Sequence, residues 1–138
     1  MNANGQNWPW MQFNDYNLVF LTIHRKERFI CMKKFTYENI LHAKELNVYL
    51  EQGNNVLGML GYTEHTRKHA AKVAVTAGKL LKKLGYDEHC VELARIAGYM
   101  YDLGNCINRM DHAHTGALMA FQFLRDWGAP PDDIARII

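Results

Sequence analysis

The segment IAGYMYDLGN, residues 96–105, decides how the rest of the chain is interpreted. It is a mostly apolar run that ends on Asp102 and then reaches Gly104. A helix that is apolar on nearly all sides is usually buried in the middle of a domain, so we expect this one to be central. A desolvated carboxylate is costly unless it is paired or bound to a metal ion. Asp102 therefore predicts a polar site at the end of a central helix.

Histidines flank this segment on both sides. Apolar residues at three- and four-residue intervals predict a long preceding helix, and extending their stripe backwards places His69 on its core side and His65 one turn nearer its start; the stripe consists of Val73, Ala77, Leu80, Leu81 and Leu84. Downstream, His112 falls in the first turn of a helix that Asp111 would cap. Each residue alone has a structural alternative: a hydrogen-bonded core histidine, a helix cap or an exposed side chain. Together, imidazole and carboxylate from three helices indicate a metal site in an all-helical core.

Caps and breaks divide the chain into about five helices, which predicts an all-α bundle. Gly98, inside the central helix, predicts a close contact with a neighbouring helix. Gly104 is expected to end the central helix through special backbone angles. The expected starts are the N-caps Thr36, Thr63, Asp87 and Asp111, and the expected ends are Gly53, Gly85, Gly104 and the break at residues 128–131.

Composition limits the functional class. The chain has 138 residues, of which 49% are apolar and 22% charged, so one domain with a real core fits. The net charge of +2 argues against a nucleic-acid partner that binds through overall charge. No apolar run is long enough to predict a membrane partner. The cysteines are odd in number and lack CxxC spacing, so we expect free thiols and a cytoplasmic location; they are Cys31, Cys90 and Cys106.

The first thirty-one residues differ from the rest in being rich in asparagine and aromatic side chains, with a weak structural pattern. We expect residues 1–31 to be an irregular extension. Codons for Lys26-Glu27-Arg28 can be purine-rich, like a ribosome-binding site, and Met32 follows at a suitable spacing. We therefore hypothesise that Met32 is the natural start. Residues 32–138 form the expected domain, and the lack of a helix-ending signal before Ile138 leads us to expect that it continues further.

Three segments together resemble the HD-domain superfamily of metal-dependent phosphohydrolases. They are HAAKVA at 69–74, AGYMYDLGN at 97–105 and DHAHTGA at 111–117, and the resemblance covers about residues 60–138. It implies an HD-like helical bundle. It also implies hydrolysis of a phosphate ester or a nucleotide, with a small phosphorylated molecule as substrate.

The resemblance also implies roles for single residues. His69, Asp102 and His112 match metal ligands, with Mn, Fe, Zn or Mg as the divalent cation. Asp102 would be the central carboxylate, and we take it together with His65 as the catalytic pair, His65 contacting the phosphate or transferring a proton. The candidates for phosphate contact are Lys68, Lys72 and Arg109.

Two departures from the family's pattern leave more than one functional prediction open. Tyr101 stands where the family carries the histidine of its naming dyad, and a phenol is a poor ligand for a divalent cation compared with imidazole. Asn105 stands where members often carry a basic residue, which would weaken one phosphate contact. The first alternative is a site that works with a single metal. The second is a degenerate HD-like domain without hydrolytic activity, serving nucleotide binding, regulation or the formation of a homodimer.

Overall fold

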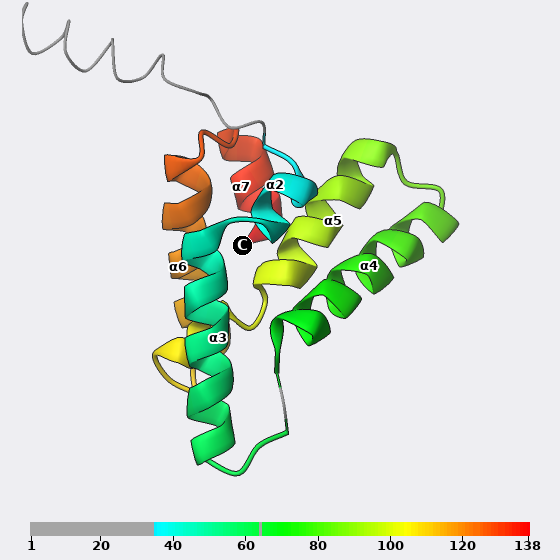
Figure 1. Ribbon diagram of the computed structural model, residues 1–138. Helices are drawn as coiled ribbons and strands as arrows, with labels where there is room; N and C mark the ends of the chain where they lie inside the picture. Colours follow the sequence, from blue (N-terminus) through cyan, green and yellow to red (C-terminus); the bar gives the residue numbers. More distant parts are fainter. Residues whose placement is uncertain (1–34, 64) are drawn as a thin grey trace, which may run out of the picture. The chain divides into compact units, whose positions relative to one another are not determined.

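The computed structural model describes residues 35–63 and 65–138, and this part of the chain is helical and contains no strand (Figure 1). The predicted all-α class is confirmed. The expectations for residues 1–31 lie outside the described residues. The described elements are α2 (Tyr37–Leu41), α3 (Lys44–Met59), α4 (Arg67–Lys83), α5 (Glu88–Met100), the 3₁₀ helix η1 (Leu103–Cys106), α6 (His112–Asp126) and α7 (Pro131–Ile137).

Helix α5 lies at the centre of the bundle, as its apolar sequence predicts. It packs most extensively against α4 and also contacts α2 and α7 (Figure 1). A side chain at Gly98 would place its Cβ 3.0 Å from the Cα of Ala74. Gly98 is therefore a point of close approach between the α4 and α5 backbones, which confirms the predicted helix contact.

The buried face of α4 differs from the predicted stripe. Its buried residues are Ala70, Ala74 and Gly78, whereas Leu80 is 57% and Leu84 64% exposed. Small side chains face α5 because the two backbones are too close for leucine. His69 follows the edge of this face and is half-buried.

Two of the predicted N-caps were correct. Thr36 caps α2 by accepting a hydrogen bond from the backbone N–H of Asn39, and Asp87 caps α5 by accepting one from Cys90 at 2.7 Å. Asp111 precedes α6 as predicted, but its carboxylate accepts a hydrogen bond from His114 Nδ1 instead of capping the helix.

Two other boundaries were wrong. Helix α4 is capped by Thr66, whose hydroxyl accepts from the His69 N–H, and not by Thr63. Gly53 does not stop α3, which runs through it to Met59. Gly53 is buried against η1, where a Cβ would lie 3.2 Å from the Cys106 nitrogen. In a helix interior a glycine is then a contact point and not a terminator.

The prediction that Gly104 ends the central helix through special backbone angles was also wrong. Helix α5 ends at Met100, and among the described glycines a positive φ occurs at Gly61, Gly85 and Gly128. Gly104 is required for packing, since a Cβ there would overlap the backbone carbonyl oxygen of His112. It thus lets the first turn of α6 pack against η1.

Two smaller findings concern the described part of the chain. No helix in residues 35–63 and 65–138 combines the length and apolarity needed to cross a membrane. Cys90 and Cys106 are free thiols.

Candidate functional site

A connected set of polar side chains lies where α4, the end of α5, η1 and the start of α6 meet. It contains the three residues that the sequence singled out as ligands, three further residues that join them, and His65 at its edge. We call this set the polar cluster; it consists of His65, His69, Tyr101, Asp102, Asn105, Arg109 and His112.

Asp102 is the buried centre of the polar cluster. The residue is 6% exposed, and its Oδ1 accepts a hydrogen bond of 2.8 Å from Asn105 Nδ2. Its Oδ2 is buried and has no hydrogen-bond partner among the described residues. A buried acceptor without a donor costs about 1–3 kcal/mol. This oxygen is therefore available to a cation or to a hydrogen-bond donor from a ligand.

Tyr101 connects Asp102 to His69. Its hydroxyl lies 2.7 Å from His69 Nε2. Burial, and next the neighbouring Asp102 carboxylate, raise the pKa of the Tyr101 phenol, against a smaller lowering by Arg109. The phenol consequently stays protonated at neutral pH. It holds the His69 nitrogen that a metal would use.

His112 is held in one tautomer. Its Nδ1 lies 2.9 Å from the carbonyl oxygen of Arg109, and because a carbonyl can only accept, Nδ1 carries the proton. In the neutral ring the lone pair is then on Nε2, which is the form a metal ligand needs. That lone pair faces Arg109 Nη1 at 3.4 Å, while the same guanidinium donates to Asn105 Oδ1 at 3.2 Å.

His65 is not on the helix with His69, contrary to the prediction. It lies in the segment before α4, where its backbone N–H donates to Asn54 Oδ1 at 2.8 Å and its Nδ1 donates to the Thr63 carbonyl at 2.6 Å. Its ring still contacts His69, with 5.4 Å between centroids. His65 therefore lies at the edge of the polar cluster, but it is positioned by the segment before α4 and not by the helix itself.

The carboxylate and imidazole groups of the polar cluster are of the types that bind divalent cations, but both histidine nitrogens already contact other side chains. Asp102 offers an open carboxylate oxygen, yet Tyr101 and Arg109 occupy the inner nitrogens of the two histidines. Within the residues that the structure describes, no group of three histidine, cysteine, aspartate or glutamate residues is arranged to hold a metal ion. Binding at all three predicted ligands would require Tyr101 and Arg109 to move.

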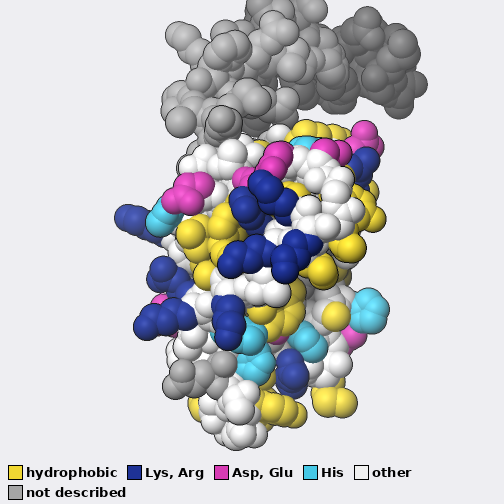
Figure 2. Space-filling model, turned by 90° about the vertical axis from the view of Figure 1, so that its right-hand side faces the viewer, with side chains coloured by type: hydrophobic (Ala, Val, Ile, Leu, Met, Phe, Trp, Pro, Cys, Tyr) yellow, Lys and Arg dark blue, Asp and Glu magenta, His cyan; other side chains and the backbone are white. Residues whose placement is uncertain are grey.

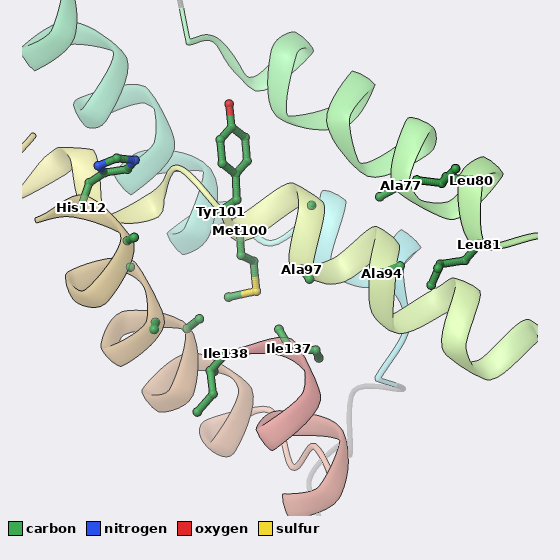
Figure 3. A pocket seen from close by; sticks show the side chains of 15 residues that line it. Ala77, Leu80, Leu81, Ala94, Ala97, Met100, Tyr101, His112, Ile137 and Ile138 are labelled. Carbon is green, nitrogen blue, oxygen red and sulfur yellow. The ribbon is translucent and has the colours of Figure 1, made fainter. Parts of the chain in front are cut away.

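An apolar cavity of about 580 Å³ borders the polar cluster (Figure 3). Tyr101 and His112 are its polar lining residues, while the rest of its wall comes from small and aliphatic side chains of α4, α5, α6 and the end of α7. In Figure 3 the Met100 side chain points into this space, and the Tyr101 hydroxyl points away from it. The cavity thus lies beside the polar groups and not among them.

Two structural roles were missed by the sequence analysis. Asn105 is 1% exposed and bridges Asp102 to Arg109, whereas the sequence indicated only the absence of a basic residue there. Tyr62 lies under the Arg109 guanidinium, 5.1 Å from its ring centroid. The sequence could have indicated the role of Asn105, because an amide three residues after an aspartate can hydrogen-bond to it. No sequence pattern indicates the contact of Tyr62 with Arg109, because the two residues are far apart in the chain.

Comparison with known proteins does not identify a family for this chain. No protein-family model matches the chain, and no solved structure matches it. An uncharacterized protein of Methanocaldococcus jannaschii is 30% identical over 101 residues, which cover 62% of this chain and 39% of the relative. The chain thus spans about two fifths of the length of the curated relative it matches.

Proposed function

We propose that this chain carries the site of a metal-dependent phosphohydrolase that acts on a phosphate ester or a nucleotide. The observation that supports it most is the buried Asp102 Oδ2 without a hydrogen-bond partner, in a polar cluster that also contains His69 and His112. A buried carboxylate oxygen of this kind is stabilised by a cation. The resemblance of residues 60–138 to the HD-domain superfamily supports the same proposal.

Three residues would hold the cation. Asp102 would contribute its open oxygen, His112 its Nε2 lone pair, and His69 its Nε2 once the Tyr101 hydroxyl has moved aside. The chemistry that a divalent cation supplies in such a place is polarisation of a phosphoryl oxygen and a bound water of lowered pKa. Asn105 would keep the Asp102 carboxylate oriented, since it holds Oδ1 at 2.8 Å.

Basic residues near the polar cluster would bind the phosphate. Arg109 is half-buried, presents its guanidinium beside His112 and is held over the Tyr62 ring, so it is positioned to neutralise phosphoryl charge. His65 has its Nδ1 proton committed to Thr63, which leaves its Nε2 as the atom able to accept a proton from a nucleophile.

The hydrogen bond between Tyr101 and His69 favours the second candidate function. It occupies a ligand nitrogen in the arrangement described, and the raised pKa of the phenol opposes its conversion to a phenolate ligand. Under this alternative the chain is a degenerate HD-like domain that binds a nucleotide without hydrolysing it or serves a regulatory role.

A pair of variants separates the two functions. Metal content and Mn²⁺-dependent hydrolysis of p-nitrophenyl phosphate and of a nucleoside monophosphate are measured for the wild type, Asp102→Ala and Tyr101→His. The proposed hydrolase predicts turnover in the wild type that Asp102→Ala abolishes. It also predicts tighter metal binding in Tyr101→His, because imidazole replaces a phenol.

The other outcomes decide against the proposal in different ways. Nucleotide binding by the wild type without turnover, together with turnover in Tyr101→His, supports the degenerate domain. No bound metal in either protein would reject the ligand assignment of His69, Asp102 and His112.

A further inference from the structure

Helix α4 carries a concentrated positive charge, although the net charge of the whole chain is only +2. It contains six lysine or arginine residues and no acidic residue among its 17 positions. All six are exposed. Figure 2 shows lysine and arginine side chains gathered over the face on which α4 lies, with histidine side chains near them. The six are Arg67, Lys68, Lys72, Lys79, Lys82 and Lys83.

Four of these lysines form a line along the helix. At 100° per residue, Lys68, Lys72, Lys79 and Lys83 fall within about 60° of one another around the axis. With a rise of 1.5 Å per residue they span about 22 Å. Within the described residues none of the four makes an ion pair with a carboxylate, whereas Lys82 pairs with Glu88 at 2.7 Å. We call this line of four residues the lysine row.

The lysine row begins at the polar cluster. Lys68 precedes His69 directly, and with Arg67 it lines a second cavity of about 470 Å³ that also includes Thr66, Asn54 and Glu51. Lys79 lies about 15 Å along the helix from His69, and Lys83 about 21 Å. An anion that reached from the polar cluster to Lys83 would have to be extended and carry several charges.

We propose that the lysine row binds a linear chain of phosphates, one end of which reaches the polar cluster. This inference rests on the proposed function, which makes the polar cluster the place where one end of the phosphate chain binds. It deepens the function by naming the substrate class: an inorganic polyphosphate or a single-stranded oligonucleotide, which share a backbone of repeated phosphates. The low net charge of the chain does not conflict with it, since net charge counts charges without locating them.

A linear anion fits this surface better than a membrane does. Membrane binding by a basic helix requires apolar side chains among the cations. Between Lys68 and Lys79 the exposed large apolar side chain on α4 is Val75. Leu80 and Leu84 lie at the far end of the helix.

The test measures binding by fluorescence anisotropy of a short labelled oligothymidylate to the full chain, without added metal. Lys79→Gln/Lys83→Gln removes two charges from the row and keeps helix propensity. Lys44→Gln/Arg125→Gln, on α3 and α6, removes the same charge elsewhere. In the Lys79→Gln/Lys83→Gln variant, losing two phosphate contacts should reduce the steepness of log affinity against log salt by about 1.4. At about 0.1 M salt this corresponds to a loss of affinity of roughly 25-fold. The control variant should bind like the wild type.

Competition identifies the source of the phosphates. Displacement of the oligonucleotide by inorganic polyphosphate supports the proposal, and the ratio of the two affinities shows whether the bases add to binding. Equal affinity of the two double variants, or no displacement by polyphosphate, overturns it, as does binding confined to phosphatidylserine vesicles. Because this assay needs neither metal nor turnover, it is independent of the Asp102→Ala experiment, and either proposal can fail without the other.

Discussion

Replacing Asp102 by asparagine tests whether the buried carboxylate oxygen is a cation ligand. In the metal-free protein Oδ2 lacks a donor, which costs about 1–3 kcal/mol. An asparagine keeps an oxygen for the Asn105 amide and removes the buried negative charge that lacks a donor at Oδ2. We therefore expect Asp102→Asn to raise the free energy of unfolding of the metal-free protein by about 1 kcal/mol, at the low end of that cost.

The same variant should lose stabilisation by metal. A cation at a concentration 100 times its dissociation constant stabilises the wild type by about 2.7 kcal/mol, and Asp102→Asn should gain almost none of it. For a domain of this size 1 kcal/mol corresponds to about 3–5 °C in Tm. Thermal unfolding with and without Mn²⁺ measures both effects.

Asp111→Asn provides the matched control. Asp111 lies near the site, but its side chain is 63% exposed and contacts His114. This variant should change neither the metal-free Tm nor the response to Mn²⁺. A metal-free Asp102→Asn protein clearly less stable than the wild type would refute the reasoning, because it would mean that Oδ2 is already satisfied. Equal responses of the wild type and Asp102→Asn to Mn²⁺ would refute the role of Asp102 as a ligand.

Three further predictions concern packing and pH. Gly104→Ala should destabilise the protein by about 3 kcal/mol in urea unfolding, since the new Cβ would overlap backbone; Gly58→Ala, with open space around it, should be neutral or stabilising. The raised pKa of Tyr101 stabilises the fold below the ordinary tyrosine pKa of 10.0, and this stability is lost as pH rises through the higher folded value. Tyr101→Phe should therefore flatten the alkaline fall in Tm, and an unchanged profile would contradict the pKa shift. The Cys90 N–H lowers the pKa of Asp87, so its contribution is present at neutral pH and lost as pH falls through the folded value; Asp87→Asn should lose less stability than the wild type on acidification, as circular dichroism at decreasing pH can show.

The sequence by itself determined the helical class and the central position of α5, and it singled out His69, Asp102 and His112, three members of the polar cluster. These depend on local signals: apolar periodicity, capping side chains and an aspartate at the end of an apolar run. The caps Thr36 and Asp87 were found because each hydrogen bond spans three residues. His69, Asp102 and His112 were found because a polar group at the core end of a helix requires a partner.

Only the tertiary structure decided how these residues are connected. The face of α4 with small side chains and the packing roles of Gly53 and Gly104 depend on how closely another backbone approaches. The spacing of apolar residues in the sequence does not indicate that distance. The Tyr101 contact with His69 joins residues 32 positions apart. Long-range contacts of this kind depend on the relative placement of whole helices, so the chemistry of the site, unlike its composition, becomes visible only in three dimensions.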